Sequence, residues 1–407
     1  MDDSTLQIAV IGAGPVGMAL ALQAARALPE SGVTLFDARA AEKDMSGDPR
    51  TLALSLGSVQ LLERLGAWRA EHAQPILEVH VSQQAPSMPA LWSGLFGEPC
   101  LRIRAIDEAV PLLGAVLSYG AIVAPLQQAW MAAQAAEPKR LRSRFGEPVA
   151  ALKNLERSVE VDAGIAERFD LAIVAEGGVF SDRVRKSVGP QDRSPVRHDY
   201  RQTAWVGRVG FDNASGRCAR GVAFERFTRH GPAALLPLKD GGAGLVWCVP
   251  SDDDPVRELD DAQRKAVLNS IFHPVVGRIA SISPLKQFPL GLNAERTLTD
   301  GRTVRIGNAA QTLHPVAGQG LNLGLRDAFE LVQALSRNND VDAVLRRLEW
   351  QRGPDRWAMI AATDFLARSF TWKLPGAGAA RGLGLAALQA LGPVKSALAR
   401  QMMFGSR

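Results

Sequence analysis

The sequence contains few cysteines and no long apolar segment. The three cysteines, Cys100, Cys218 and Cys248, are far apart and have no C-x-x-C spacing. We therefore expect reduced thiols, and predict neither a disulfide framework nor a metal site. The longest apolar runs, such as residues 382–392, are well short of the roughly 20 residues that a membrane-spanning helix needs. An integral membrane protein is therefore not expected.

The N-terminus lacks the features of a secretory signal. It begins with acidic residues and continues directly into an apolar strand, without a basic segment or a small-residue cleavage site. We therefore expect a cytoplasmic protein. The chain has 407 residues, of which 46% are hydrophobic and 22% are charged, which is typical of a soluble globular protein with two or three domains.

Acidic residues are absent from the end of the chain. After Asp364 there are six cations and no acid, so residues 1–364 have a net charge of −1 although the whole chain has +5. The K/R-rich runs of nucleic-acid sites are missing, so no nucleic-acid partner is predicted. The cations alternate with apolar residues, which favours a peripheral position on anionic lipid at the inner face of the membrane. Packing of this tail on the rest of the chain, or on a partner protein, is the alternative. The cations are Arg368, Lys373, Arg381, Lys395, Arg400 and Arg407.

A glycine-rich turn near the N-terminus indicates a dinucleotide site. Gly12, Gly14 and Gly17 follow an apolar strand with G-x-G-x-x-G spacing, and a helix to about Leu28 is predicted after them. The next strand ends in Asp37, 20 residues after Gly17. In such a unit the glycines admit a pyrophosphate to the helix N-terminus, and the carboxylate accepts from the ribose hydroxyls. A tight strand–helix turn without a ligand is the alternative.

The middle of the chain predicts a helix and then a second sheet. Residues 50–68 have the spacing of an amphipathic helix after a turn that contains Arg50, which either holds a phosphate or lies on the surface. From Val149 to Val174 the pattern changes to strands. Residues 200–300 contain several short strands separated by Gly, Pro and Asp, which predicts an antiparallel sheet inserted into the nucleotide domain.

A second glycine-rich stretch, Arg305 to Gly324, distinguishes between possible cofactors. Gly318, Gly320 and Gly324 lie where another helix is predicted to begin. An NAD-dependent dehydrogenase has no need of a second loop, whereas the longer FAD requires backbone contacts far from the first one. This loop therefore favours FAD. The alternative is that its glycines only let a helix pack closely on the sheet.

Four segments resemble the ubiquinone-biosynthesis hydroxylases, which are aromatic-ring flavin monooxygenases. They are IGAGPVGMALAL, DPRTLALSLGSVQLLERLGAW, ERFTRHGPAALLPL and VRIGNAAQTLHPVAGQGLNLGLRDA, and the closing ARQMMFGSR is similar too. The resemblance is greatest to the 2-polyprenyl-6-methoxyphenol hydroxylase branch. It implies an α/β fold with a Rossmann-like FAD-binding domain of the para-hydroxybenzoate-hydroxylase type, an inserted antiparallel-sheet substrate domain and C-terminal helices. The implied parts are residues 1–75, 100–186 and 300–364 for FAD, 76–99 and 187–299 for substrate, and 365–407 for a helical tail.

The same resemblance implies the role of each site residue. Asn308 stands where most flavin hydroxylases have an aspartate, and its amide both donates to and accepts from the ribityl hydroxyls. Pro315 is placed beside the isoalloxazine, and the backbone of Gly318 to Gly320 at its N1–C2=O edge. A helix N-terminus there stabilises the negative charge of reduced flavin. Pro315, Gln319 and Gly320 are therefore the predicted catalytic residues. The predicted cofactor-binding residues are Gly12, Gly14, Gly17, Asp37, Arg50, Glu176, Gly307, Asn308, Gly318, Gln319, Gly320, Leu321 and Asn322.

Two residues in the motifs that resemble this family, Glu176 and His314, need an interpretation of their own. In VAEGGVFSDRVR, Glu176 replaces the aspartate that is usual in the family, and one residue is inserted before Ser181. We interpret Glu176 as a longer carboxylate that still reaches the cofactor. His314 precedes Pro315, and we interpret it as a residue that caps the loop, in preference to a general base.

The implied reaction is the hydroxylation of a polyprenylated phenol in ubiquinone biosynthesis. NAD(P)H, bound transiently, reduces FAD, O2 adds at C4a, and the hydroperoxide transfers oxygen to the electron-rich ring. Other ubiquinone-biosynthesis proteins are expected partners. Two alternatives are a flavin hydroxylase of a small soluble aromatic compound and a non-catalytic flavoprotein subunit of a biosynthetic assembly.

Overall fold

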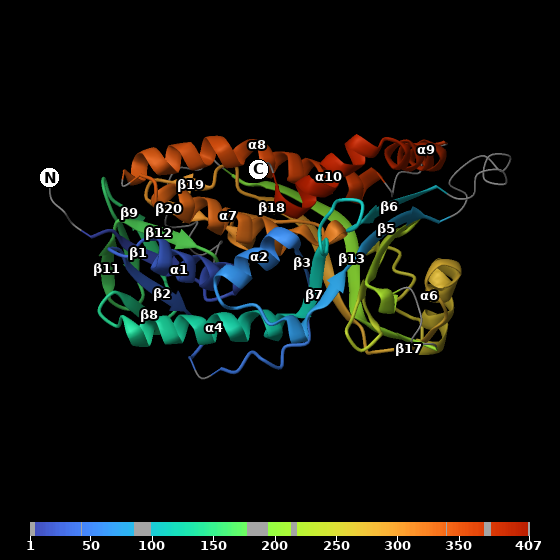
Figure 1. Cartoon of the computed structure of the whole chain (residues 1–407), viewed down its shortest axis with the longest axis horizontal. Helices are drawn as coiled ribbons and strands as arrows, with labels where there is room; N and C mark the ends of the chain where they lie inside the picture. Colours follow the sequence, from blue (N-terminus) through green and yellow to red (C-terminus); the bar gives the residue numbers. More distant parts are fainter. Residues whose placement is uncertain are drawn as a thin grey trace.

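A six-stranded sheet forms the part of the chain in which the sequence predicts a nucleotide site (Figure 1). The computed structural model describes residues 5–41, 43–84, 99–176, 194–212, 218–338, 340–369 and 376–405. In this sheet the order is β19-β20-β12-β1-β2-β8, and every neighbouring pair is parallel except β19 with β20. Its strands are β1 (Gln7–Ile11), β2 (Gly32–Asp37), β8 (Leu141–Phe145), β12 (Leu171–Val174), β19 (Thr299–Asp300) and β20 (Thr303–Arg305).

Both faces of this sheet are covered, because alternate side chains of a strand point in opposite directions. Ile8 and Val10 of β1 pack against helices, whereas Ala9 and Ile11 pack against a small separate sheet. The helices are α1 (Pro15–Ala27), α4 (Tyr119–Ala136) and α7 (Gln319–Leu335), and α1 lies between the other two. The small sheet consists of β9 (Ala151–Asn154), β10 (Val159–Asp162) and β11 (Ala166–Phe169).

A nine-stranded sheet forms the second large unit. Its pairs are antiparallel except for β14 with β5, and α6 (Asp261–Val276) covers one face over an apolar core that includes Trp205, Leu235 and Phe272. The strands are β5 (Glu78–Gln83), β6 (Cys100–Arg104), β13 (Val196–Phe211), β14 (Val222–Thr228), β15 (Gly231–Pro237), β16 (Ala243–Pro250), β17 (Ile279–Ile282), β18 (Lys286–Ala294) and β21 (Gln311–Thr312).

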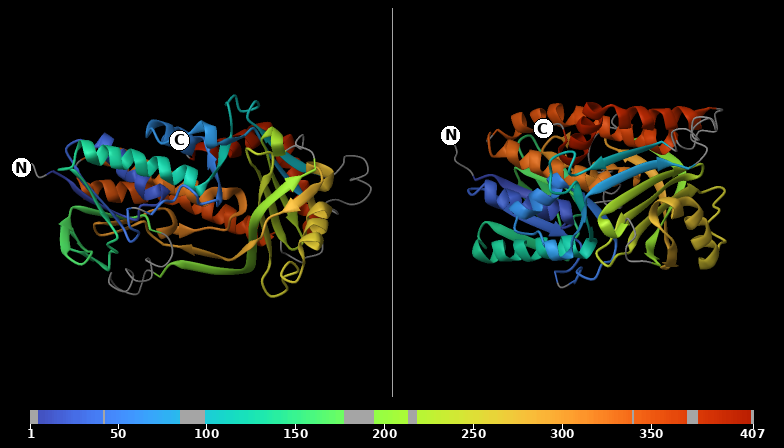
Figure 2. Two further views of the ribbon diagram at one scale, coloured as in Figure 1. Left: turned by 90° about the horizontal axis from the view of Figure 1, so that it is seen from below. Right: turned by 45° about the vertical axis from the view of Figure 1, so that its right-hand side comes forward.

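Further elements connect the two large sheets. A three-stranded sheet of β3 (Thr51–Ser55), β7 (Gly114–Ser118) and β4 (Gln74–Ile76) lies next to α2 (Leu56–Arg64). The C-terminal helices are α8 (Val341–Ser369), α9 (Ala377–Ala390) and α10 (Gly392–Phe404), and they lie along one side of the molecule (Figure 2). The predicted fold class, with its FAD-binding domain, inserted sheet and C-terminal helices, is confirmed.

Three details differ from the sequence-based expectation. Residues 51–55 were expected in a helix but form β3, because they pair with β7. Strand β6, expected in the FAD-binding domain, pairs with β5 in the larger sheet. Helix α8 continues past residue 364 without a break, so the tail does not begin there.

Candidate flavin site

Three loops meet at the carboxyl edge of the six-stranded sheet. They follow β1, β12 and β20, which are parallel neighbours and therefore end at the same edge. A Cβ added to Gly12 of the first loop would lie 2.8 Å from the backbone nitrogen of Glu176 in the second. Residues that are far apart in the sequence are thus brought into contact. The remainder of the Glu176 motif, including Ser181, lies outside the described residues.

The glycines of the first loop differ in what surrounds them. A Cβ on Gly17 would lie 1.9 Å from the carbonyl oxygen of Gly12, so Gly17 is required for packing of α1 against the loop. A Cβ on Gly14 would have the Tyr119 hydroxyl, at 3.9 Å, as its nearest neighbour. No side chain caps the N-terminus of α1. Gly14 therefore borders open space at a helix end whose N–H groups are available to a phosphate.

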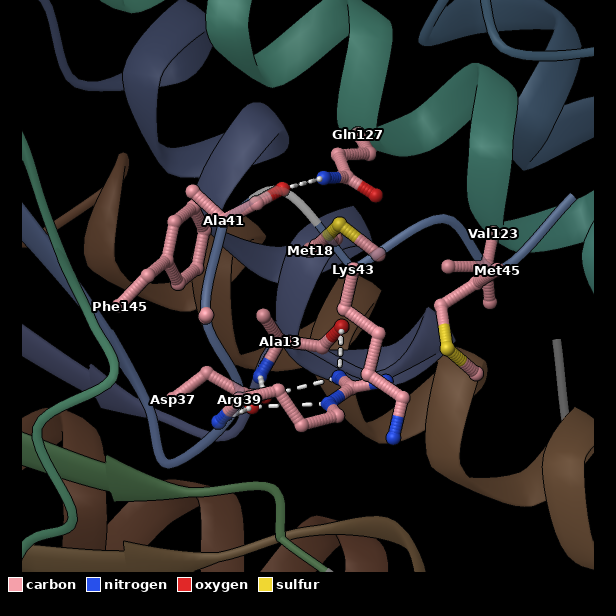
Figure 3. Close-up of a pocket in the computed structure, with 11 residues that line it drawn as sticks. Ala13, Met18, Asp37, Arg39, Ala41, Lys43, Met45, Val123, Gln127 and Phe145 are labelled. Atoms are coloured by element: carbon pink, nitrogen blue, oxygen red, sulfur yellow. Dashed lines mark hydrogen bonds and ion pairs between the residues drawn. The ribbon is translucent and has the colours of Figure 1, made fainter.

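Asp37 is held in its ionised form at the end of β2 (Figure 3). Its Oδ2 accepts from the backbone nitrogen of Ala13 at 2.6 Å, and its Oδ1 accepts from Nε of Arg39 at 2.8 Å. Burial opposes ionisation, but these hydrogen bonds outweigh it and hold the pKa of Asp37 below its usual value. Arg39 was not predicted as a site residue, although the Asp-Ala-Arg run places it two residues after the acid.

Arg50 lies near the first loop but is paired within the protein. Its guanidinium forms two-point contacts with Asp48, including Nη2 to Oδ2 at 2.8 Å, and stacks over the ring of Tyr119 at 4.2 Å. Tyr119 is the residue whose hydroxyl approaches Gly14. The guanidinium is therefore placed beside the loop, and a role in holding a phosphate stays a prediction.

The glycines of the second loop also have two different surroundings. A Cβ on Gly324 would lie 2.8 Å from Cα of Gly307 and from a methyl group of Val16, so this glycine permits close packing. A Cβ on Gly320 would have no described atom within 4 Å. Helix α7 starts one residue before Gly320, with neither a side-chain cap nor an acid in its first turn. The packing explanation thus accounts for Gly324, whereas Gly320 borders open space.

Other predicted residues surround this second helix end. The side chain of Asn308, directly after Gly307, is exposed, whereas Gln319 is buried. Asn322 is fully bonded within the protein: its Oδ1 accepts from the Ser55 backbone and the Ser58 hydroxyl, each at 2.8 Å. Its Nδ2 donates to two carbonyls, those of residues 53 and 318, at 3.0 Å. Its side chain therefore fixes the helix end, and only its backbone remains for a cofactor. Leu321 packs at the margin of the main core.

His314 serves the loop itself. The Val316 backbone donates to its Nδ1 at 3.2 Å, so the proton of the neutral ring is on Nε2, which lies 2.9 Å from Oε1 of Gln202. Burial lowers the pKa of His314 to about 4. Both ring nitrogens are occupied, which agrees with the role of a loop cap.

These features fit FAD. Open space at Gly14 and at Gly320 lies at the uncapped N-termini of two neighbouring helices, α1 and α7. Such ends suit a pyrophosphate and the electron-rich edge of a flavin. Asp37 is ionised, and both of its carboxylate oxygens accept hydrogen bonds from Ala13 or Arg39, so its contact with a ribose stays a prediction. Among the described residues, no cluster of His, Cys, Asp or Glu suitable for a metal ion is present.

Comparisons with known proteins identify the fold. Residues 171–360 match the FAD binding domain family. The structure is similar to p-nitrophenol 4-monooxygenase PnpA from Pseudomonas putida, with a TM-score of 0.72 and 15% identity over 99% of both chains. It is also similar to Klebsiella pneumoniae HpxO complexed with FAD and uric acid, with a TM-score of 0.68 and 16% identity over 98% of this chain and 97% of that one. The fold is that of the FAD-binding monooxygenases.

Sequence relatives define the family more closely. The ubiquinone hydroxylase UbiL of Rhodospirillum rubrum is 30% identical over 98% of this chain and 90% of that protein. The 3-demethoxyubiquinol 3-hydroxylase of Escherichia coli is 29% identical over 97% of each. The chain belongs to the family of FAD-dependent hydroxylases of ubiquinone biosynthesis. Three predictions are thereby confirmed: the family indicated by the sequence motifs, the FAD cofactor and the class of enzyme. None of the described helices is long and apolar enough to cross a membrane.

Proposed function

We propose that the protein hydroxylates the aromatic ring of a polyprenylated phenol that is a precursor of ubiquinone. The observation that carries this proposal is the pair of open helix ends at Gly14 and Gly320 in a chain whose full-length relatives are ubiquinone hydroxylases. O2 is the second substrate, and NAD(P)H is the reductant, as is typical of the family.

The residues present divide the binding of FAD between the two loops. The N-terminus of α1 next to Gly14 holds the pyrophosphate, and Asp37 accepts from the ribose. Asn308 contacts the ribityl chain, and Pro315 and the backbone of Gln319 and Gly320 contact the isoalloxazine. When bound, FAD supplies the activation of O2 and the transfer of one oxygen atom to the ring. The protein orients the phenol and excludes water.

The proposal is tested in cells from which this gene has been deleted. We expect a polyprenylated phenol that lacks one ring hydroxyl to accumulate and ubiquinone to fall, both measured by mass spectrometry. Expression of the wild-type chain should restore ubiquinone, whereas expression of a variant that cannot bind FAD should not. Normal ubiquinone content in the deleted strain would contradict the proposal. The position of the missing hydroxyl identifies the ring carbon that is modified.

We further propose that α9, α10 and the loop that follows β6, which contains Ile106, contact the membrane in which the polyprenyl chain is dissolved. These elements carry five exposed apolar side chains: Ile106, Leu383, Leu391, Val394 and Leu398. The cations of the tail are less available than the sequence suggests. Arg400 lies 3.8 Å from Glu108, and Arg381 donates to the carbonyl of Ser369 at 2.6 Å. Lys373 and Arg407 lie outside the described residues. Apolar contacts should therefore contribute more to docking than charge does.

A Val394→Ser/Leu398→Ser variant tests this surface. These two side chains lie one turn apart on α10 and are 51% and 37% exposed. Each should contribute about 1 kcal/mol when it enters the interface, so binding to phosphatidylcholine/phosphatidylglycerol vesicles should fall about 10-fold or more. Sedimentation with vesicles at low and high salt measures it.

The matched control is Ile165→Ser, because Ile165 is 74% exposed and belongs to a turn of the small sheet far from α10 in sequence. It should bind vesicles as the wild type does. Equal binding by all three proteins, or none by the wild type, would contradict the membrane proposal. Either result would leave the hydroxylase proposal standing, and the second would favour a protein partner for this surface.

A further inference from the structure

One face of the nine-stranded sheet is directed toward the second glycine loop. Gln202 of β13 contacts His314 of that loop, and Phe227 of β14 packs against Val316. The opposite face carries the core that α6 covers. Residues two apart in a strand share a face, so Ala204 lies on the same side as Gln202, and Glu225 on the same side as Phe227. Cross-strand partners share a face as well, which adds Cys248, the partner of Ala204, and Ala234 and Val81, the partners of Glu225, to the loop-facing side.

This loop-facing side is less closely packed than the α6 side. Along β15 and β16, Ala233, Leu235 and Leu245 on the α6 side are fully buried. Their neighbours Ala234, Leu236 and Val246 on the loop-facing side are partly exposed. An apolar surface that protein side chains leave partly uncovered, opposite the loop assigned to the flavin, is suited to an aromatic ring.

Glu225 is the acidic side chain on this surface. It lies between Ala223, which packs toward α2 and α10, and Phe227, which packs toward Val316. Val81, directly opposite Glu225 on the neighbouring strand, packs against the apolar cluster of Ala223 and also against the apolar cluster of Phe227. Among the described residues, no hydrogen-bond or ion-pair partner is found for the Glu225 carboxyl. Glu225 is partly exposed, and a carboxyl with apolar neighbours and no protein partner is costly, so its presence in an apolar wall requires an explanation.

The surroundings of Glu225 change its acidity. Burial raises the pKa of Glu225 to about 8. Burial and the neighbouring Glu225 also raise the pKa of the Cys248 thiol, so that group is neutral. On the same side, His314 is held neutral, and Arg381 is bonded to Gln83 and the Ser369 carbonyl. Strands β5 and β15 face the carboxyl with the apolar Val81 and Ala234.

We propose that Glu225 is a further catalytic residue, which binds the phenolic hydroxyl of the substrate and accepts its proton. This inference rests on the proposed function, because it takes the substrate to be a phenol. The phenolic O–H bond breaks, a new O–H bond forms on the carboxylate, and the electron pair remains on the phenol oxygen. The resulting phenolate is richer in electrons and is attacked more readily by an electrophilic oxygen. The proton later leaves to water, which restores the carboxylate.

The pKa of about 8 determines how the proton transfer from the phenol to Glu225 depends on pH. Below that value Glu225 is protonated and cannot accept the proton, and above it the carboxylate can. The rate of hydroxylation should therefore rise through an inflection near pH 8. An unassisted phenol would instead ionise near its own pKa of about 10, the value typical of a phenolic hydroxyl.

The test compares the FAD-loaded wild type with Glu225→Gln, which has nearly the same shape but cannot accept a proton. The probe is 2-prenylphenol, and two quantities are measured from pH 6 to 10: its hydroxylation rate and, by ultraviolet difference spectra, the fraction of bound phenol that is ionised. In Glu225→Gln we expect the rate at pH 7.5 to fall about 100-fold and both inflections to move toward pH 10, with FAD content unchanged. Glu225→Asp should retain an inflection below pH 9. The control Glu63→Gln, at an exposed site on α2, should behave as the wild type.

The possible results separate the two proposals. If Glu225→Gln keeps the wild-type profile of bound-phenol ionisation, the role of Glu225 is overturned. If the wild type ionises the bound phenol near pH 8 but forms no hydroxylated product, the role of Glu225 stands and the proposed function fails. If Glu225→Gln loses the inflection but keeps its melting temperature and FAD content, a merely structural role is excluded.

Discussion

Replacement of Asp327 by alanine is expected to lower the free energy of unfolding by about 3–5 kcal/mol. Asp327 on α7 is buried, and its Oδ1 accepts from Nε and Nη2 of Arg352 on α8, at 3.0 and 2.8 Å. Nη1 of Arg352 also donates to Asp355 at 2.5 Å. Without Asp327, the buried guanidinium would have only one of its two carboxylate partners. Because α7 begins at the second glycine loop, the affinity for FAD should fall as well.

Urea denaturation of the FAD-free protein measures this loss. The control is Asp212→Ala, which removes a solvent-exposed ion pair with Arg278 at 3.5 Å, where both side chains are about half exposed or more. An exposed pair contributes at most about 1 kcal/mol, so the midpoint of that variant should change little. A loss below 1 kcal/mol in Asp327→Ala would show that the α7–α8 ion pair is not needed for the fold.

Replacement of Gly14 by valine is expected to lower the affinity for FAD at least about 100-fold, or more than 2.7 kcal/mol. The branched side chain would occupy the open space at the N-terminus of α1, where the pyrophosphate is proposed to bind. The apoprotein should keep its melting temperature. Gly14 has φ −77°, which a valine can adopt, and the nearest atom to an added Cβ is 3.9 Å away.

Titration of the apoprotein with FAD, followed by quenching of flavin fluorescence, measures this affinity. Gly17→Val is the contrasting variant. Its Cβ would overlap the carbonyl of Gly12, so the protein itself should be destabilised or fail to fold. Full occupancy by FAD in Gly14→Val would refute the assignment of the first loop. Loss of the fold in Gly14→Val would mean that this glycine, like Gly17, is a packing residue.

Local backbone chemistry explains why the backbone framework of the candidate cofactor site could be predicted from the sequence. A strand, a turn with glycines at fixed spacing and a helix place N–H groups at one point regardless of what surrounds them. The predicted Gly12, Gly14 and Asp37 therefore lie at one sheet edge, and α7 begins at Gln319, within the glycine-rich stretch where a helix was predicted to begin. The roles given to individual atoms, such as Asn308 at the ribityl chain, came from the resemblance and stay predictions.

How each residue is used depends on the tertiary structure, because it brings distant segments of the chain into contact. The spacing of glycines does not reveal that Gly17 and Gly324 serve packing while Gly14 and Gly320 border open space, because this depends on neighbours from other elements. In the same way, the alternation along β14 establishes that Glu225 and Phe227 share a face, but not which face it is. Contacts between the sheet and the loop after β21 make it the loop-facing one, since two faces of one strand differ only in what packs against them.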